Sequence, residues 1–310
     1  MFGKQQVASM INRSAENESD RRKFLRTAGL TGLGVVGAAA LAGAEVLPAN
    51  AASASAISDG AILNFALNLE YLEAEFYHYA AYGTGIPEKL THGKGDRGPV
   101  VGGSKVPFKT AKIKQIAEEI ASDEKEHVAF LRAALGGAKV SRPKIDLKAS
   151  FTAAAMAAGL IKKGQTFDPF ADEVSFLAGA FLFEDVGVTA YKGAAPLITN
   201  KTYLGAAAGI LAVEAYHAGI VRTELFNAGG ASTVKAISDA RDSLDGKSDL
   251  DKGLGKANSR SLVPVDKNGI AFGRTPGQVL NIVYLNPKKV TEGGFFPKGV
   301  NGSINTSAKH

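Results

Sequence analysis

The sequence lacks cysteine altogether, since none of its 310 residues is a Cys. Without thiols the chain can form no disulfide, no thiolate zinc site and no cysteine-ligated iron–sulfur cluster. A metal ion bound by this protein would therefore be held by carboxylate, imidazole or hydroxyl groups, which are hard or borderline ligands.

Concentrated positive charge is also missing. The formal net charge is +6, but the chain has no long run of Lys or Arg and no basic stretch with interleaved aromatic residues. Proteins that bind nucleic acids often show one of these patterns, so we expect no nucleic-acid partner. We interpret the basic balance as a solvated surface, with weak attraction to anionic lipid or cell-wall polymer as the alternative.

What the sequence does contain is a repeated Glu-x-x-His phrase. Glu124-Lys-Glu-His127 returns as Glu214-Ala-Tyr-His217, and both copies lie in segments rich in helix-forming residues. Residues three positions apart share one face of a helix, so each Glu and His can reach the same ion. This spacing predicts metal ligands.

A second repeat precedes each copy of the phrase. Glu70 and Tyr77 lie upstream of the first copy, and Glu184 and Tyr191 lie upstream of the second, with the same spacing from Glu to Tyr. The chain thus reads Glu, Glu-x-x-His, Glu, Glu-x-x-His on four helical segments. This is the ligand order of dinuclear metal sites in ferritin-like four-helix bundles.

We therefore predict a site for two divalent metal ions, Fe or Mn. Its ligands are expected to be Glu70, Glu124, His127, Glu184, Glu214 and His217. Two divalent cations would neutralise four carboxylates that are too costly to bury unpaired. The alternative is a metal-free core network, neutralised by Arg or by raised pKa values. Both metals accept the same ligand set, so the sequence does not choose between them.

Three further residues are expected near this site. Glu73 lies one turn from Glu70 on nearly the same helix face and is the alternative or additional ligand. Tyr77 and Tyr191 lie two turns along from the predicted ligands of their own helices. Each either hydrogen-bonds to a ligand or is an ordinary core tyrosine.

Other residues and segments are assigned more ordinary roles. Arg132 and Arg222 follow each His by five positions and should pair at the surface or between helices. His78 and His92 lack a motif partner and are expected to be structural or surface groups. The composition of residues 242–256 would permit disorder.

Apolar periodicity predicts an all-α fold. The long helices are expected at 59–82, 110–135, 168–191, capped by Asp168, and 200–226, and short ones at 149–160, 232–244 and 275–284. This is a ferritin-like four-helix bundle, residues 57–228, with a long crossover between helices two and three. A mostly irregular C-terminal extension, residues 229–310, should pack on it through two Phe in the turn 293–299. The loop 83–110 is expected to be either a lid or a contact surface.

The N-terminal segment 1–56 reads as an export signal. Residues 20–26, Asp-Arg-Arg-Lys-Phe-Leu-Arg, resemble a twin-arginine signal, and a Gly- and Ala-rich apolar stretch leads to Ala-x-Ala cleavage candidates. A membrane-spanning helix is the alternative. We expect Arg21 and Arg22 to be read by the twin-arginine export machinery, which would place the protein in the periplasm or another extracytoplasmic location.

Beyond the signal, the chain resembles a known family. The stretch 62–77, Ile-Leu-Asn-Phe-Ala-Leu-Asn-Leu-Glu-Tyr-Leu-Glu-Ala-Glu-Phe-Tyr, together with 274–276, 282–284 and 293–299, is similar to exported ferritin-like domain proteins that include the plant desiccation-related proteins. The resemblance implies a fold like that of bacterioferritin, rubrerythrin and manganese catalase. It implies chemistry only loosely, because this fold hosts several activities.

The leading functional hypothesis is an exported di-metal protein that reacts with H2O2 or O2. Glu124 and Glu214 are expected to bridge the ions, and each His to cap one of them. Manganese would favour catalase-like dismutation, and iron would favour ferroxidase or peroxidase activity. The alternative is a non-enzymatic envelope or stress protein that uses the bundle as a scaffold. A homo-oligomer is compatible with either hypothesis.

Overall fold

The computed structural model describes residues 57–255 and 262–310. The predicted export signal, with Arg21 and Arg22, lies outside the described residues. Within them the fold is all-α apart from one small sheet of two strands. The expected fold class is thus confirmed.

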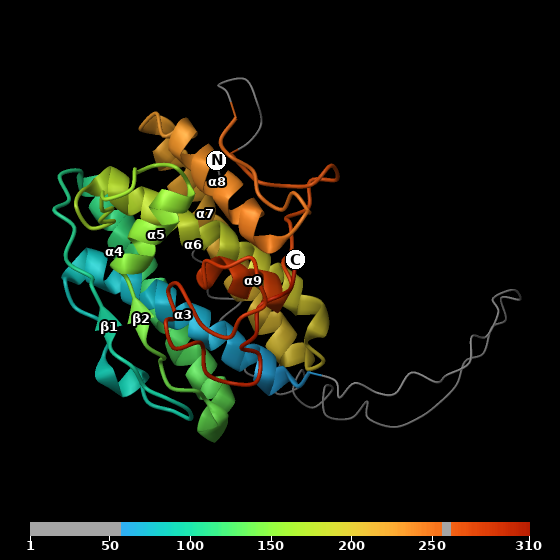
Figure 1. The fold of residues 1–310 in the computed structure, drawn as a ribbon. Helices are drawn as coiled ribbons and strands as arrows, with labels where there is room; N and C mark the ends of the chain where they lie inside the picture. Colours follow the sequence, from blue (N-terminus) through green and yellow to red (C-terminus); the bar gives the residue numbers. More distant parts are fainter. Residues whose placement is uncertain (1–56, 256–261) are drawn as a thin grey trace, which may run out of the picture. The chain divides into compact units, whose positions relative to one another are not determined.

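Four long helices form the bundle (Figure 1). They are α3 (Asp59–Tyr82), α4 (Ala111–Leu135), α6 (Glu173–Ala194) and α7 (Lys201–Asn227). Helix α3 packs along α4, α6 packs along α7, and α3 also meets α6. The hairpin α3–α4 therefore packs against the hairpin α6–α7, and each hairpin carries one copy of the two sequence repeats.

Side-chain caps set where three of these helices begin. Ser58 caps α3, and Asn200 caps α7 by accepting hydrogen bonds from two backbone N–H groups. Asp168 was expected to cap the third helix, and this prediction is wrong. Asp168 accepts a hydrogen bond from the N–H of Phe170 in a preceding turn, and Asp172 is the cap, accepting from the N–H of Ser175.

The crossover between α4 and α6 is partly structured. It carries β2 (Ile145–Asp146) and α5 (Ala149–Ala157), which ends before the predicted position 160 because Gly159 turns the chain at a φ of 69°. Strand β2 pairs in parallel with β1 (Val100–Val101) from the loop between α3 and α4. That pairing attaches the Gly-rich loop to the crossover.

The C-terminal extension packs against the bundle. It contains α8 (Ala231–Asp245) and α9 (Pro276–Val283), and both helices contact α6. Phe295 inserts its ring edge-on between Phe151 and Phe183, with ring centroids 5.0 and 4.9 Å apart. Of the two Phe predicted to anchor the tail, Phe295 thus packs on α5 and α6, and Phe296 is buried with its ring edge-on to Tyr284 of the extension itself.

A buried ion network fastens the extension to the outer side of α6. Its members are three cations and three anions, Arg222, Arg241, Arg274, Asp185, Asp245 and Asp251. Asp185 accepts from Arg222 and Arg241, and Asp251 accepts from Arg241 and Arg274. Composition alone allowed disorder around Asp245 and Asp251, but both are buried and paired. Arg222 pairs between elements and does not lie at the surface.

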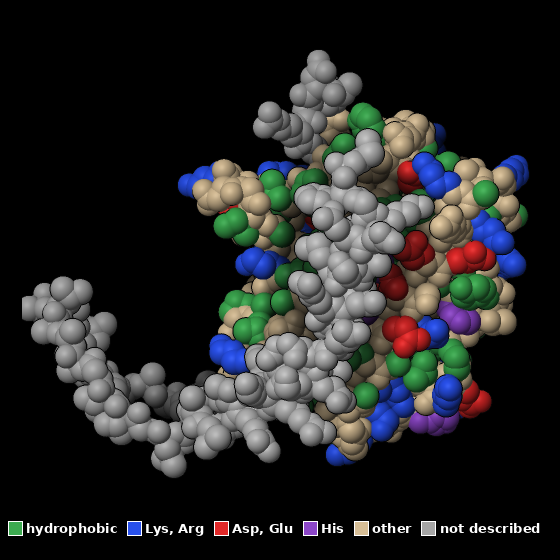
Figure 2. Space-filling view, turned by 180° about the vertical axis from the view of Figure 1, so that it is seen from behind, with side chains coloured by type: hydrophobic (Ala, Val, Ile, Leu, Met, Phe, Trp, Pro, Cys, Tyr) green, Lys and Arg blue, Asp and Glu red, His purple; other side chains and the backbone are tan. Residues whose placement is uncertain are grey.

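Charged side chains on the surface are mixed in sign. In the face drawn in Figure 2, the Lys and Arg of the described residues are spread along the margins, with Asp and Glu between them. Such a surface favours solvation over binding to one kind of charged partner.

Truncating Arg274 should destabilise the fold strongly. Its guanidinium is fully buried and donates to Asp245, Asp251 and Thr189. Arg274→Ala would leave Asp245 buried without its cation and Asp251 with Arg241 as its remaining partner, which costs about 3–5 kcal/mol of unfolding free energy. Denaturant titration measures this loss. The control Lys235→Ala removes an exposed pair with Asp239 and should cost about 0.3–0.5 kcal/mol; similar losses in both variants would contradict the prediction.

Candidate metal centre

The six predicted ligands come together in the middle of the bundle. They form two groups that could each hold a metal ion: Glu70, Glu124, His127 and Glu214 in one, and Glu124, Glu184 and His217 in the other. Within each group the ligand atoms lie within 4.8 Å of one another. All six residues are buried.

Glu124 is the carboxylate that the two groups share. Its Oε2 lies 3.4 Å from Nδ1 of His127, and its Oε1 lies 3.1 Å from Nδ1 of His217. Glu214 lies 3.7 Å from His127 and belongs to one group only. Sequence spacing predicted that Glu124 and Glu214 both bridge the two ions, but in the structure only Glu124 is shared by the two groups.

The two remaining glutamates each face one histidine. Oε2 of Glu70 lies 3.3 Å from Nδ1 of His127, and Oε2 of Glu184 lies 3.7 Å from Nδ1 of His217. Each half of the cluster therefore contains one histidine, one outer carboxylate and one oxygen of the shared Glu124, and the half around His127 also contains Glu214.

The tyrosines hold the outer carboxylates in a crossed arrangement. Tyr77 of α3 donates a hydrogen bond to Oε1 of Glu184 on α6, and Tyr191 of α6 donates to Oε1 of Glu70 on α3. Of the two roles considered for these tyrosines, the structure shows hydrogen bonding to a predicted ligand. One oxygen of each outer carboxylate is fixed in this way, and the other points towards a histidine.

The inward-facing atoms of the cluster fit a pair of metal ions. Eight buried atoms have no hydrogen-bond partner within the described part of the chain: Oε2 of Glu70 and Glu184, both carboxylate oxygens of Glu124 and Glu214, and Nδ1 of His127 and His217. Buried polar atoms are nearly always paired in native proteins. Six carboxylate oxygens and two imidazole nitrogens are a donor set suited to divalent Fe or Mn.

The electrostatics of the cluster are dominated by burial. Burial raises the pKa of Glu70 to about 7 and that of Glu184 to about 8. Burial acts against the ionised form of Glu124 too, but the close approach of both histidine rings outweighs it and lowers the pKa of Glu124 to about 2. Burial opposes the charged form of the histidines as well, yet the facing carboxylates raise the pKa of His127 to about 11 and that of His217 to about 9.

A fifth buried carboxylate, Glu73, lies beside the cluster and belongs to neither group of ligands. Burial, reinforced by the charges of Glu124 and Glu184, raises its pKa well above 4.5. Gly187 of α6 makes room for it: a Cβ there would collide with Oε2 of Glu214 and lie 3.3 Å from Oε1 of Glu73. The role of Glu73 as an alternative ligand stays a prediction.

The sequence reasoning missed Asp123. Its Oδ2 lies 3.1 Å from Nε2 of His217, the ring nitrogen that faces away from Glu124. A carboxylate in this position fixes the tautomer of a histidine and directs its other nitrogen towards a metal. The corresponding position before Glu214 is Val213, so only one half of the repeat has this contact. This difference between the two copies of the repeat was the sequence feature that could have pointed to Asp123.

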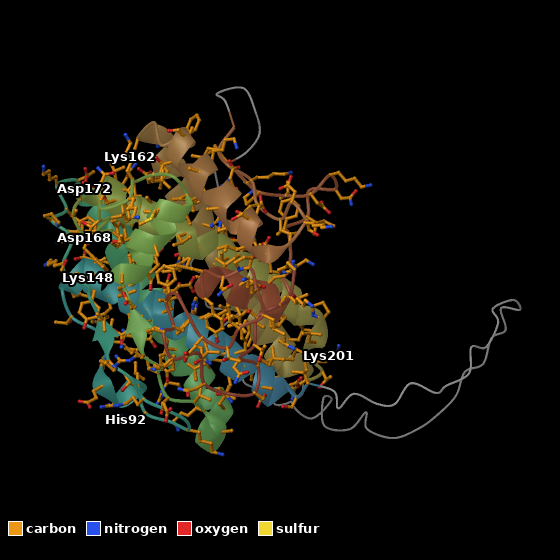
Figure 3. All side chains as sticks on the ribbon, viewed as in Figure 1. His92, Lys148, Lys162, Asp168, Asp172 and Lys201 are labelled. Carbon is orange, nitrogen blue, oxygen red and sulfur yellow. The ribbon has the colours of Figure 1, made fainter. Side chains whose placement is uncertain are left out.

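The arginines and histidines outside the cluster have structural contacts. Arg132 is buried and donates to the hydroxyl of Tyr71, which is the inter-element pairing that was expected as one alternative. His78 contacts the carbonyl of Thr84 through Nδ1. His92 lies exposed on the loop between α3 and α4 (Figure 3).

The fold and the cluster define a ferritin-like protein with a carboxylate–histidine centre. The chain belongs to the ferritin-like domain family, whose model matches residues 58–227. Two relatives match over 265 residues, or 78% of this chain. Desiccation-related protein PCC13-62 of Craterostigma plantagineum is 32% identical, with 82% of its length covered. Ferritin-like catalase Nec2 of Nesocodon mauritianus is 28% identical, with 83% covered. No solved structure gives a significant match. The expected resemblance to plant desiccation-related proteins is confirmed.

Removing the shared carboxylate should abolish metal pairing. Glu124→Ala takes one ligand from both groups, whereas Glu214→Ala takes one from a single group. We expect Glu124→Ala to retain no metal pair, and Glu214→Ala to lose the ion on the His127 side first. Metal content per chain, measured by mass spectrometry after reconstitution, tests this. Glu119→Ala, an exposed position on α4, is the matched control. Two ions in Glu124→Ala would show that the ligand assignment is wrong.

Proposed function

We propose that this protein is an exported di-metal oxidoreductase that reacts with H2O2 or O2 and protects against oxidative or desiccation stress. The observation that carries the proposal is the position of Glu124, whose two oxygens face two separate histidine–carboxylate groups. A shared carboxylate of this kind suits two neighbouring ions.

The chain would hold the ions with the two ligand groups described above. When bound, a pair of redox-active ions supplies the two electrons that peroxide chemistry exchanges. The protein keeps the ligands in place: Tyr77 and Tyr191 fix the outer carboxylates, and Asp123 orients His217. Burial excludes water from the ligand oxygens, which strengthens every electrostatic contact among them.

The relatives support the choice of reaction and setting. One relative is named a ferritin-like catalase and the other a desiccation-related protein. A catalase reaction converts two molecules of H2O2 into two of water and one of O2, and a manganese pair would favour it. An iron pair would favour ferroxidase or peroxidase work. Export is part of the proposal because of the twin-arginine pattern in the sequence. Fractionation of cells that carry the double variant Arg21→Lys, Arg22→Lys tests it. The variant protein should stay in the cytoplasm.

Reconstitution tests the proposed function directly. The full chain, loaded anaerobically with Mn or Fe, should bind about two ions per chain, as the ligand set of this bundle class implies. It should then release O2 from H2O2, or oxidise Fe(II) with O2. The alternative, a non-enzymatic scaffold, predicts neither bound metal nor turnover. A chain that binds no metal after reconstitution would therefore rule out the proposal.

The stabilisation by metal should grow as the pH rises. His127 and His217 have folded pKa values of about 11 and 9, above the unperturbed 6.5. The stability from their charged forms is therefore complete below about pH 6.5 and is lost as the pH rises through 9 and 11. Metal binds the neutral rings and therefore displaces their protons. For each proton displaced, the apparent metal-binding constant should rise about tenfold per pH unit.

Calorimetry with and without Mn between pH 5 and 8 measures this dependence. The metal-induced rise in melting temperature should be larger at pH 8 than at pH 6 and should fade on acidification. Buffers of different ionisation enthalpy should reveal proton release on binding. An equal rise at both pH values would contradict the assignment of the two histidines as ligands.

A further inference from the structure

A small apolar cavity lies against the carboxylate cluster. It is enclosed by residues of α3, α6 and α9 and by Phe295, and its volume is about 20 Å³. Leu72, Val186 and Val283 are among the side chains that line it. A space of this size holds one small molecule, and apolar cavities of this kind stay dry and take up uncharged guests such as xenon.

Two residues distinguish the end of this cavity that meets the cluster. Glu73 is the one ionisable group of the lining, is 5% exposed, and makes no hydrogen bond or ion pair with any residue in the described ranges. Gly187 also belongs to the lining, and a side chain there would occupy the space next to Glu214 and Glu73. Because Gly187 has no side chain, the carboxylate of Glu214 approaches the backbone of α6 there, and the wall of the cavity at Gly187 separates it from Glu214 by backbone alone.

The opposite side of the cluster is polar. Asp123 has a side chain that is 43% exposed, and it contacts His217 directly. On the side of α4 and α7, solvent therefore reaches a residue in direct contact with a predicted ligand. A polar molecule that needs hydrogen bonds would approach more easily here than through an apolar cavity, where its polar groups would lose their partners.

We propose that the cavity between α3, α6 and α9 is a binding site for dioxygen, which passes between it and the metal centre at Glu73 and Gly187. The proposal rests on the proposed function. Dioxygen would be the product that leaves in a catalase-like reaction and the reactant that enters in a ferroxidase-like one. H2O2 would use the polar side near Asp123.

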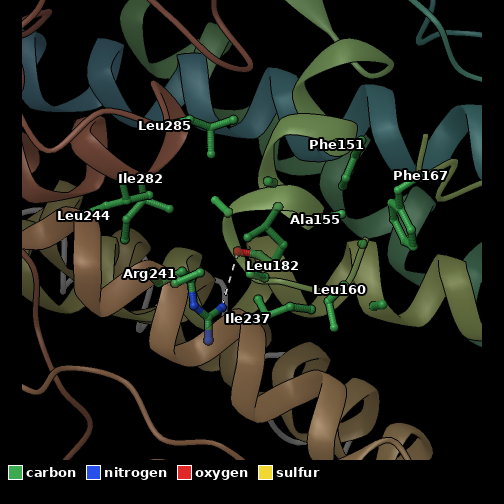
Figure 4. Close-up of a pocket in the computed structure, with 16 residues that line it drawn as sticks. Phe151, Ala155, Leu160, Phe167, Leu182, Ile237, Arg241, Leu244, Ile282 and Leu285 are labelled. Atoms are coloured by element: carbon green, nitrogen blue, oxygen red, sulfur yellow. Dashed lines mark hydrogen bonds between the residues drawn. The ribbon is translucent and has the colours of Figure 1, made fainter. Parts of the chain in front are cut away.

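A second cavity of similar size provides a matched control. It has a volume of about 30 Å³, is lined by residues of α5, α6, α8 and α9, and includes Leu244 and Ile237 (Figure 4). None of the predicted ligands lines it. Val283 lines only the first cavity and Leu244 lines only the second, among the described cavities.

Xenon provides a readout that does not depend on metal. Crystals of the full chain under xenon pressure should show xenon in the first cavity. Val283→Phe should abolish that site, and Leu244→Phe should retain it. Val283→Met adds less bulk and adapts more easily, so it replaces the Phe variant if that one does not fold. A wild-type cavity without xenon would overturn the proposal, whatever the metal content.

Oxidant selectivity provides the second readout. In the protein loaded with Fe(II), Val283→Phe should slow the oxidation of the bound iron by O2 by roughly tenfold to a hundredfold. This is the range of affinity that the two atoms of O2 can contribute when they are buried in a cavity. Oxidation by H2O2 and the metal content should stay unchanged, and Leu244→Phe should resemble the wild type. Unchanged oxidation by O2 in a Val283→Phe protein that has lost the xenon site would overturn the proposal. A wild type that binds no metal would instead count against the proposed function.

Discussion

Five glutamates gathered in one cluster inside the helical bundle impose the constraint on which the rest of this structure depends. Each ionised carboxylate would cost several kcal/mol if it were left without a partner. Two imidazoles and two phenol hydroxyls partner some of the oxygens, but two positive rings cannot balance five carboxylates. Part of the imbalance is met by protons, since burial raises several of the pKa values. Two divalent cations would meet it more completely, which is why the donor set favours metal.

The same constraint links the site to the register of the bundle. Tyr77 and Glu70 lie on α3, Tyr191 and Glu184 lie on α6, and each tyrosine binds the glutamate of the other helix. A slip of one turn between α3 and α6, about 5.4 Å, would break both hydrogen bonds together. The cluster is therefore part of what specifies how the two hairpins pack, and Gly187 allows the close approach that the packing requires.

The clustering of these carboxylates and histidines could be predicted because it depends on spacing within helices. Side chains spaced three or seven residues apart share one face of a helix, and this does not depend on how the neighbouring helix packs. Asp123 could not be placed in the same way, because its contact with His217 depends on how α4 lies against α7. The start of α6 was misjudged for a similar reason: Asp168 and Asp172 are both suitable caps, and the turn around Phe170 uses the first. Local patterns identify capable residues, and tertiary packing selects among them.

The C-terminal extension contributes to the site although it supplies none of its predicted ligands. Glu184 and Asp185 are neighbours on α6, about 100° apart around the helix axis, so one faces the cluster and the other faces the Arg–Asp network. Repulsion among the inner carboxylates acts to spread the helices. The network ties α6 to α7 and α8 from outside with balanced charges. These ion pairs act against that repulsion, and the extension also supplies part of the wall of the cavity that reaches Glu73.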